Sequence, residues 1–513
     1  MQQSVDKVMK GWRGDLWALL AGGLGVLAFA PFSIYPLAVL SPLILFIAWG
    51  NLSPKRALWR GWLYGIGLFG CGVSWIAIPV ATFGGLDFIS SIILTSAFVS
   101  ILALYFGGLG YAVVYYFPAC EKVRLLLILP ASWTLIEWLR SWLFTGFPWL
   151  LFGYSQIDSP LAGYAPLFGV YGVTWVTIFS AGLLLFGMIS NTRLGWKKIG
   201  GLLVLMWVIG ALLTHISWGR KVDKVLDVAL VQASIPQELK YQPSQTAPSL
   251  QRYLTLSKAH HDADLIIWPE TAIPVFYDEA SKLIERLEEM AFLYGVEFLV
   301  GVPEREILVD VKTENIHRNY YNSVMQINTK GTNFYRKQHL VPFGEYLPLR
   351  EELSFLWQHI SIPFSNYSAG KKNQRLLKFK GIAAGIAICY EDAFSDEVQH
   401  HLTAAGFLIN VSNDAWFGHS LAPHQHLQIA RMRALELGRY LLRSANTGIT
   451  AVIDPHGKIV KQSKQFEEYV IRAKINAYEG GSLYALSGNV PLLIIMIFCL
   501  MSGVMLSRYW CVS

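Results

Sequence analysis

The sequence predicts a membrane protein with two parts, a bundle of eight transmembrane α-helices and a polar α/β domain. Hydrophobic residues make up 53% of the 513 residues and charged residues only 15%, a balance that is unusual for a soluble protein. The apolar residues are concentrated in long uncharged runs, whereas charged residues populate one stretch from about Arg220 to Glu479. We therefore divide the chain into residues 1–218 with seven helices, 219–485 as the polar domain, and 486–513 with the eighth helix and a short tail.

The apolar runs have the length that a bilayer crossing requires, which is about 20 residues. The first run, Leu16–Pro54, is long enough for two crossings and is broken at Pro31-Phe32-Ser33. Further spans follow at once and no clear small-residue cleavage site precedes them, so we interpret the first helix as part of the bundle and not as a signal peptide. The predicted helices cover residues 15–31, 34–51, 59–80, 88–117, 122–141, 164–190, 198–217 and 488–507.

Basic residues gather at every second connection between these helices, which predicts the orientation of the chain. They are Lys7, Lys10, Arg13, Lys55, Arg56, Arg60, Lys122, Arg124, Arg193, Lys197, Lys198 and Arg508. The opposite connections, near Phe32 and at residues 81–86, carry no Lys or Arg. Both termini are therefore expected in the cytoplasm, and the polar domain in the periplasm of a bacterium with two membranes. The net charge of +7 comes mostly from these anchors, and no basic stripe points to nucleic acid.

The polar domain alternates short β-rich runs with amphipathic helical patterns, which predicts an α/β domain with layered sheets. The predicted strands are Val225–Gln232, Asp264–Trp268, Glu297–Val302, Ile382–Cys389 and Phe407–Val411. The predicted helices are Leu250–His261, Glu279–Tyr294, Ser395–Ala405 and His426–Arg439. A hairpin is expected over Ile449–Lys461, with its turn at Asp454-Pro455-His456-Gly457.

Cys389 is the only cysteine between Cys120 and Cys499, so the polar domain cannot contain an internal disulfide. It ends a strand of small and branched apolar residues and precedes Tyr390 and Glu391. A strand-to-helix turn of this kind presents a nucleophile, although a lone cysteine can also be a small buried hydrophobe that ends a core strand.

Two further motifs favour the nucleophile. Ile266-Ile267-Trp268-Pro269-Glu270 presents a carboxylate at the end of a strand, and the segment from Tyr335 to Tyr346 contains Lys337 and Glu345. Singly, Glu270 could be a solvated acid and Lys337 a surface cation. Together with a thiol they form one mechanism, because a carboxylate can take the thiol proton and an ammonium can stabilise an oxyanion.

These three motifs, in this order, resemble the Glu-Lys-Cys triad of the nitrilase superfamily, and the helical part narrows the resemblance to apolipoprotein N-acyltransferases. Other matching stretches are Thr145-Gly146-Phe147-Pro148-Trp149, Val231-Gln232 with Ile235-Pro236-Gln237, and Asn410-Val411-Ser412-Asn413-Asp414-Ala415-Trp416-Phe417. The resemblance implies an αββα sandwich with Glu270 as proton acceptor, Lys337 as oxyanion stabiliser and Cys389 as nucleophile. It also implies supporting roles for Glu345, Tyr390 and Glu391. Tyr241 departs from the pattern, which has tryptophan at this position.

The same resemblance implies an acyltransferase of the bacterial inner membrane that needs no metal or organic cofactor. The donor would be a phospholipid such as phosphatidylethanolamine, and the acceptor the α-amino group of the diacylglyceryl-cysteine of an apolipoprotein. Cys389 would carry the acyl chain as a thioester in a ping-pong reaction. A membrane-anchored amidase or nitrilase would need only one anchor helix, and a scaffold or transporter would leave the three motifs unexplained.

Three other features have two readings each. His419, His424 and His426 match no zinc spacing, so we expect them at the surface or behind the reacting groups. The i, i+3 spacing of Glu137 and Arg140 predicts an interfacial ion pair, with a proton relay as the alternative. The apolar stretch at residues 353–364 either packs into the protein or forms a mobile arm that dips into the outer leaflet, and the anchors of such an arm would be Phe355, Leu356 and Trp357.

Overall fold

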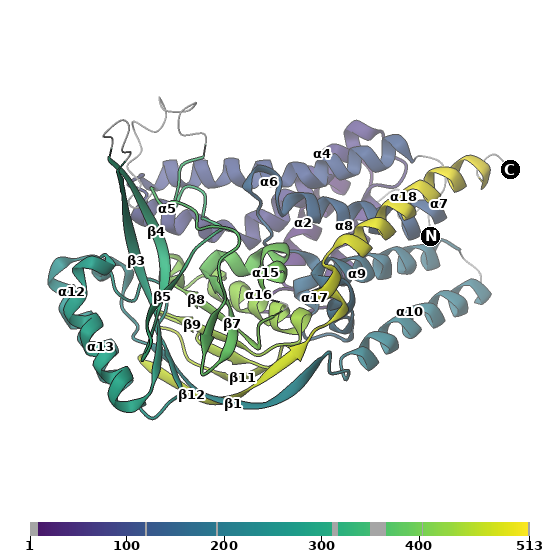
Figure 1. The fold of residues 1–513 in the computed structure, drawn as a ribbon. Coiled ribbons are helices and arrows are strands. Elements are labelled where there is room, and N and C mark those ends of the chain that lie inside the picture. The colour runs from purple at the N-terminus through teal and green to yellow at the C-terminus, as the bar shows by residue number, and fades with distance from the viewer. Residues whose placement is uncertain are drawn as a thin grey trace. The chain divides into compact units, whose positions relative to one another are not determined.

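The computed structural model describes residues 9–117, 121–190, 193–309, 316–348, 366–402 and 404–510. The chain forms two compact units (Figure 1). The helical unit comprises Met1–Ala77, Asp87–Ile216 and Leu486–Ser513, and the sheet unit comprises Ile78–Leu86 and Ser217–Ala485.

Each of the eight helices that the sequence predicts has a counterpart in the structure. These are α2 (Trp12–Val26), α3 (Leu37–Ala48), α4 (Pro54–Gly72), α6 (Phe88–Tyr116), α8 (Leu129–Arg140), α9 (Ala165–Ser190), α10 (Arg193–Leu213) and α18 (Val490–Trp510). The helix expected at 59–80 differs most, because α4 ends at Gly72 and the short α5 (Ala77–Phe83) follows a single 3₁₀ turn. A π-helical turn at Arg124–Ile128 likewise precedes α8.

Within the described residues, three helices are long and apolar enough to cross a bilayer: Phe88–Tyr116, Pro160–Ser190 and Leu194–Leu213. Pro54–Gly72 and Ser74–Phe83 pass the same test together and are bent by 55°, which makes a fourth crossing if they form one span. The apolar helix α3 is shorter, as is the described apolar part of α18. The structure therefore supports a membrane protein, while eight crossings stay a prediction.

Glycines allow α2, α4 and α6 to pack with their backbones in contact. A Cβ atom at Gly22 would overlap the carbonyl group of Tyr64, and one at Gly61 would overlap that of Phe106. Small residues at such contacts are typical of helices that associate in lipid, where close van der Waals packing replaces the hydrophobic effect.

Glu137 and Arg140 do not form the interfacial ion pair that their spacing predicts. Both are buried, with 0% and 1% of their surface exposed. Glu137 accepts hydrogen bonds from Trp133 Nε1 (3.2 Å), Phe152 N (3.1 Å) and Thr174 Oγ1 (2.8 Å). Arg140 instead donates to two backbone carbonyl oxygens at 2.6 and 2.7 Å. The spacing was misleading because all of these partners except Trp133 come from outside α8, so they could not be seen in the local sequence.

The sheet unit contains two six-stranded mixed sheets, with the strand orders β12-β1-β2-β3-β4-β5 and β11-β10-β9-β8-β7-β6. The strands of the first are β1 (Gly219–Gln232), β2 (Leu265–Ile267), β3 (Glu297–Val309), β4 (Ile316–Asn328), β5 (Gly331–Arg336) and β12 (Tyr469–Gly480). Those of the second are β6 (Leu377–Phe379), β7 (Ile382–Ile388), β8 (Phe407–Ser412), β9 (Leu441–Ala445), β10 (Ala451–Ile453) and β11 (Ile459–Gln462). The five predicted strands and the hairpin are confirmed, whereas β4, β5, β6, β9 and β12 were not expected.

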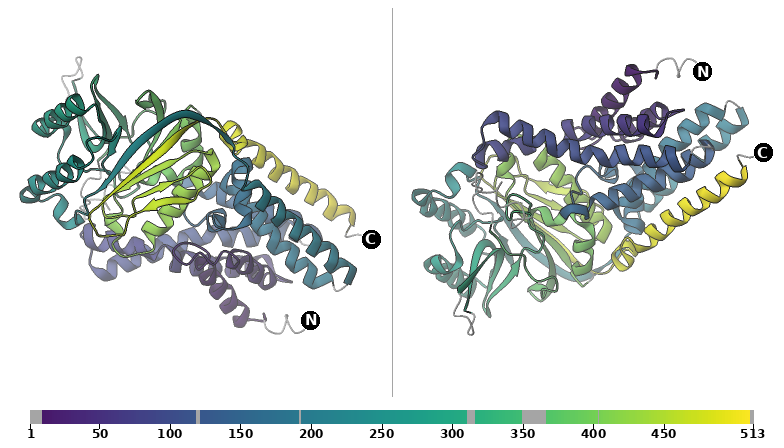
Figure 2. Two further views of the ribbon diagram at one scale, coloured as in Figure 1. Left: turned by 90° about the horizontal axis from the view of Figure 1, so that it is seen from below. Right: turned by 90° about the horizontal axis from the view of Figure 1, so that it is seen from above.

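Four helices cover the two sheets: α12 (Pro243–Lys258), α13 (Ser281–Tyr294), α15 (Ser395–Leu402) and α16 (Ala422–Leu437). A central core contains apolar side chains from both sheets, such as Leu230 and Ile409. A second core lies between the first sheet and the pair α12 and α13, and a third packs α15 and α16 on the other sheet. The unit is therefore the predicted αββα sandwich, seen from two further sides in Figure 2.

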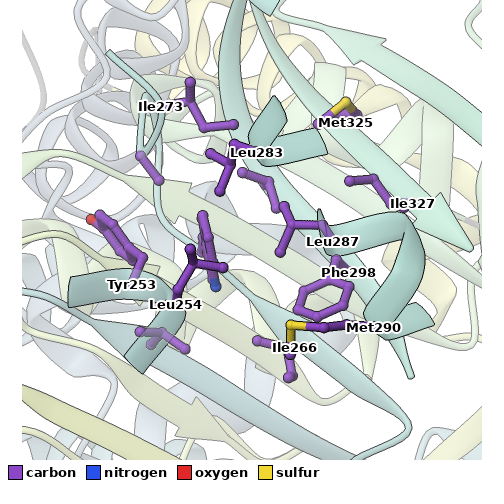
Figure 3. Packing of buried hydrophobic residues seen from close by; sticks show 14 of the residues in the cluster. Tyr253, Leu254, Ile266, Ile273, Leu283, Leu287, Met290, Phe298, Met325 and Ile327 are labelled. Atoms are coloured by element: carbon purple, nitrogen blue, oxygen red, sulfur yellow. The ribbon is translucent and has the colours of Figure 1, made fainter. Parts of the chain in front are cut away.

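The outer core of the first sheet shows why the amphipathic helix pattern was reliable. Leu283, Leu287 and Met290 follow the i, i+4, i+7 spacing along α13 and point at Phe298 and Ile327 of the sheet (Figure 3). Burying an apolar side chain of this size contributes about 1.5–3 kcal/mol.

Candidate active site

The three predicted reacting residues each follow the carboxyl end of a strand. Glu270 comes after β2, Lys337 directly after β5, and Cys389 directly after β7. Strands β1, β2 and β3 are parallel, and β5 has the same direction because β4 is antiparallel to both of its neighbours. Glu270 and Lys337 therefore share one edge of the first sheet, with Lys337 Nζ 3.6 Å from Glu270 Oε1.

Cys389 lies at the strand-to-helix turn that the sequence predicts. Its φ angle is 52°, in the left-handed region that residues other than glycine seldom adopt, and a 3₁₀ turn at Cys389–Ala393 follows. Its carbonyl oxygen is 3.2 Å from Asn410 Nδ2 and 3.2 Å from His426 Nε2. These contacts from the neighbouring strand and helix hold a backbone conformation that would otherwise be strained.

Glu270, Lys337, Glu345 and Asn322 form one buried charged cluster. Asn322 Nδ2 donates to Glu270 Oε1 and to Glu345 Oε1, both at 2.7 Å. Lys337 Nζ lies 3.0 and 2.9 Å from the two carboxylate oxygens of Glu345. Burial alone would lower the pKa of Lys337, but Glu345 and Glu270 outweigh it and raise that pKa, so the ammonium stays protonated. Glu345 is thus placed to fix the lysine, as the resemblance implies.

The surroundings of Cys389 favour the neutral thiol over the thiolate. Burial raises its pKa well above the usual value, and the charge of Glu270 raises it further, while Lys337 opposes both. A thiol in this state needs a proton acceptor at the moment of attack. In the described part of the chain Asn322 donates its hydrogen bond to Oε1 of the Glu270 carboxylate and not to Oε2.

Glu391 ties the lysine loop to the cysteine turn. It accepts hydrogen bonds from the backbone N–H groups of Gln338 (2.5 Å), His339 (3.2 Å) and Ile388 (2.6 Å). Burial raises the pKa of Glu391 to about 7, and the backbone hydrogen bonds keep the rise from being larger. Tyr390, beside the nucleophile, packs its ring on Phe394 with the centroids 4.9 Å apart.

His426 lies behind Cys389, one of the two positions that the sequence analysis allows it, but the buried charged network around it was missed. His426 Nδ1 lies 2.9 Å from Asp414 Oδ1 and Nε2 lies 3.0 Å from Asp392 Oδ1, and Arg443 Nη2 donates to Asp414 Oδ2 at 2.5 Å. Burial would lower the pKa of His426, yet Asp392 and Asp414 raise it to about 9. The sequence contained one signal for this network. Arg443 follows the two leucines Leu441 and Leu442, which suggests a buried arginine, and a buried charge needs a partner of opposite charge.

Cys389, Asp414 and His426 also bring three potential metal-ligand atoms within 4.8 Å of one another. Both ring nitrogens of His426 already face carboxylates, and the Arg443 guanidinium is bound to Asp414. A cation at this place would have to displace those contacts and lie beside a guanidinium, so the donor set does not fit a metal ion.

Two further features of the sequence analysis are Tyr241, which departs from the family pattern, and the apolar segment at residues 353–364. The Tyr241 hydroxyl lies close enough to Glu270 for that charge, together with burial, to raise its pKa. The proposed arm at 353–364, with Phe355, Leu356 and Trp357, lies outside the described residues.

Two family models match the chain. One is described as carbon-nitrogen hydrolase and covers residues 227–483, and the other as apolipoprotein N-acyltransferase N-terminal domain and covers residues 21–183. A protein of Methylococcus capsulatus described as apolipoprotein N-acyltransferase is 42% identical over 93% of this chain and 93% of its own length. One from Coxiella burnetii with the same description is 38% identical over 94% of this chain and 99% of its own. Among solved structures, Saccharomyces cerevisiae Nit3, a nitrilase superfamily member, aligns at 22% identity and a TM-score of 0.37, over 49% of this chain and 90% of its own.

Proposed function

The chain belongs to the apolipoprotein N-acyltransferase family and is an acyltransferase of lipoproteins; we propose that the acyl chain passes through a thioester on Cys389. One observation carries this proposal. The Cys389 thiol lies at a strained turn close to the buried carboxylate of Glu270 and the buried ammonium of Lys337, which are 3.6 Å apart. These are the three groups that covalent acyl transfer requires.

In the first half-reaction the Cys389 sulfur attacks the ester carbonyl carbon of the donor while Glu270 takes the thiol proton. The carbonyl electron pair moves onto oxygen, where the charge of Lys337 stabilises it. When this intermediate collapses, the carbon–oxygen bond to the glycerol backbone breaks. The leaving alkoxide takes the proton back from Glu270 and departs as lysophospholipid, which leaves a thioester on Cys389.

In the second half-reaction the acceptor amine attacks the thioester carbonyl carbon and gives its proton to Glu270. The carbon–sulfur bond breaks, the thiolate recovers that proton, and the product amide leaves. These steps use one carboxylate in both directions, and none of them calls on a metal or an organic cofactor. The neutral resting thiol favours this cycle because it is restored without an external acid.

Both substrates are proposed to be lipids, which accounts for a helical unit attached to an enzyme of the αββα fold. The donor is a phospholipid, with phosphatidylethanolamine as the proposed headgroup, and the acceptor is the α-amino group of a diacylglyceryl-cysteine. What supports this is the family membership together with the apolar helices, because both lipids must be met at a bilayer surface.

Purified full-length protein in detergent, incubated with phosphatidylethanolamine alone, should gain the mass of one acyl chain. A variant with serine at Cys71, Cys120, Cys499 and Cys511 retains only Cys389 and should gain the same mass. Adding a diacylglyceryl-cysteine peptide should then discharge the adduct and yield the N-acylated peptide. Transfer that proceeds at full rate without any adduct would contradict the thioester.

We also propose eight crossings, with helices one to seven in residues 1–218, a periplasmic catalytic domain in 219–485, and cytoplasmic termini. The alternation of basic connections supports this orientation. An alkaline phosphatase fusion after Lys224 should be active because it would be exported, whereas one after Lys55 should be inactive. The reverse pattern would overturn the orientation.

A further inference from the structure

The lysine assigned to the oxyanion is already surrounded by carboxylate oxygens. Lys337 Nζ has both oxygens of Glu345 within 3.0 Å and Glu270 Oε1 at 3.6 Å. One ammonium therefore faces two carboxylates, and this group of three carries a net charge of −1. Such a group by itself is a poor place in which to develop a further negative charge on sulfur or on a carbonyl oxygen.

A second buried lysine lies at the same site. Lys240 ends the short helix α11 (Gln237–Lys240) and has only 3% of its surface exposed. Among the residues that the structure describes, the hydrogen bond it donates goes to the Glu270 backbone oxygen at 3.2 Å, a neutral acceptor. The side chain is near enough to the Glu270 carboxylate and to the Cys389 sulfur to interact electrostatically with both.

Burying an ammonium with so little hydrogen bonding costs several kcal/mol unless nearby negative charge offsets it. Lys240 adds a second positive charge beside Glu270, so that two ammonium groups balance the carboxylates of Glu270 and Glu345. Unlike Lys337, it has donor positions that no described carboxylate occupies. Its charge is therefore available to the reacting atoms.

The segment that carries Lys240 is fixed to the other sheet. Asn446 Oδ1 accepts from Ile235 N at 3.1 Å, and Asn446 Nδ2 donates to Ile235 O at 2.8 Å. Asn413 Nδ2 donates to Gln237 Oε1 at 2.9 Å. A cation held in this way needs no reorganisation during the reaction, which is the condition for electrostatic stabilisation of a transition state.

Gln237, at the other end of α11, presents a second donor. It is 4% exposed, and it lies close enough to the Tyr241 hydroxyl to lower the pKa of that group against the effect of burial. Lys240 and Gln237 thus place two buried donors on one short helix.

We propose that Lys240 is a second cation of the acylation site, which stabilises the negative charge that develops on sulfur and carbonyl oxygen when Cys389 attacks the donor. This role rests on the thioester mechanism proposed above. In this proposal Lys240 supplies the positive charge that is free to act on the reacting atoms. Lys337 stabilises the oxyanion and at the same time neutralises part of the charge of Glu270 and Glu345.

The proposal predicts a pH dependence that an uncharged structural role would not give. Burial lowers the pKa of Lys240 to about 8, against the raising effects of Glu270 and Cys389, which are the titratable groups that face it. The further titratable groups around Glu270 are Tyr241, which follows Lys240 in the chain, and Lys337, Glu345 and Tyr367. Lys240 is thus protonated at pH 7 and loses its charge as the pH rises through about 8, so its contribution is present below that pH and lost above it.

The test is the single-turnover rate of Cys389 acylation, followed by intact mass with full-length protein and phosphatidylethanolamine from pH 6 to 9.5. K240M keeps most of the aliphatic part of the side chain but lacks the charge. It should slow acylation at pH 7 by at least about 10-fold, which is less than the roughly 10²–10³-fold loss of rate when a direct oxyanion donor is removed. K240R keeps its charge to high pH, so the ratio of wild-type to K240R rate should fall through about pH 8. The exposed Lys282 of α13 provides the control, and K282M should behave as wild type.

A second acyl donor shows whether the charge of Lys240 acts on the reacting atoms or on the phosphate of the phospholipid. p-Nitrophenyl octanoate has no phosphate, and K240M should slow acylation by it as much as acylation by phospholipid. Slowing with phospholipid alone would assign Lys240 to the lipid phosphate and overturn the proposal, as would K240M acylating at the wild-type rate. If K240M does not fold, a wild-type to K240R ratio that is constant with pH overturns it. Failure of wild type to form any Cys389 adduct would instead reject the thioester mechanism, before any Lys240 variant is compared.

Discussion

Replacing Cys389 by serine is expected to abolish both acylation and transfer, with a loss of roughly 10⁴-fold or more, the scale seen when an acyl-transfer enzyme loses its nucleophile. The physical reason is the acidity of the attacking group. Burial and Glu270 already raise the pKa of the Cys389 thiol, and a hydroxyl in the same place is a far weaker acid with the same carboxylate as its base. The measurement is intact mass after incubation with phosphatidylethanolamine, followed by peptide acylation.

The serine variant should still fold, because the turn at residue 389 is held through its backbone carbonyl, which accepts from Asn410 and faces His426 in either case. Its thermal unfolding should match that of the wild type to within a few degrees. Cys499→Ser, in α18, is the matched control and should keep full activity. A Cys389→Ser protein that transferred a substantial fraction of the wild-type amount would remove this residue from its assigned role.

The sequence could bring forward Glu270, Lys337 and Cys389 as candidate reacting residues because each stands in a short local pattern. Glu270 ends a strand, Cys389 follows one, and Lys337 lies in a stretch of recognisable type, so chain-local signals were enough. The parallel strand order then brings their carboxyl ends to the same region. The helical segments were equally accessible, because long uncharged runs need no tertiary information.

Two of the missed strands, β4 and β9, bury polar side chains. Strand β4 buries Asn322, Ser323 and Gln326, which bond to charged groups or carbonyls of neighbouring segments, so its sequence lacks the apolar run that predicts a buried strand. Strand β9 contains Arg443, fully buried against Asp414. Both depend on partners that are distant in the chain.

Lys240 and His426 illustrate the same limit at the site. Lys240 reads as one charge in a short polar helix, and only the folded chain shows it buried on the Glu270 carbonyl, 30 residues away in the sequence. His426 lies among three histidines with no metal spacing, and its two carboxylate partners lie 12 and 34 residues away. Electrostatic partners of this kind are brought together by tertiary structure. A local pattern such as Arg443 after two leucines can indicate a buried charge, but it cannot identify the partners.

Replacing Glu270 by glutamine should separate the two effects that this carboxylate has on Cys389. The amide keeps the shape and can still accept from Asn322 through its oxygen, but it cannot take the thiol proton. Loss of a general base costs about 10²–10⁴-fold, so thioester formation should slow by that factor. Lys337→Ala should also block the adduct. It leaves Glu345 buried without the ammonium that it binds, which costs about 3–5 kcal/mol of stability, so Glu270→Gln is the cleaner variant.

Alkylation of the thiol should change in the opposite direction. The negative charge of Glu270 raises the pKa of Cys389, so its removal should lower that pKa and move the pH profile of iodoacetamide labelling to lower pH. A variant that is inactive in acyl transfer but more readily alkylated at neutral pH is the expected result, and a merely distorted site would not give it. Thioester formation by Glu270→Gln at the wild-type rate would exclude Glu270 as the base. An alkylation profile displaced to higher pH would contradict this expectation. It would mean that the Glu270 carboxylate lowers the pKa of Cys389 in the wild type instead of raising it.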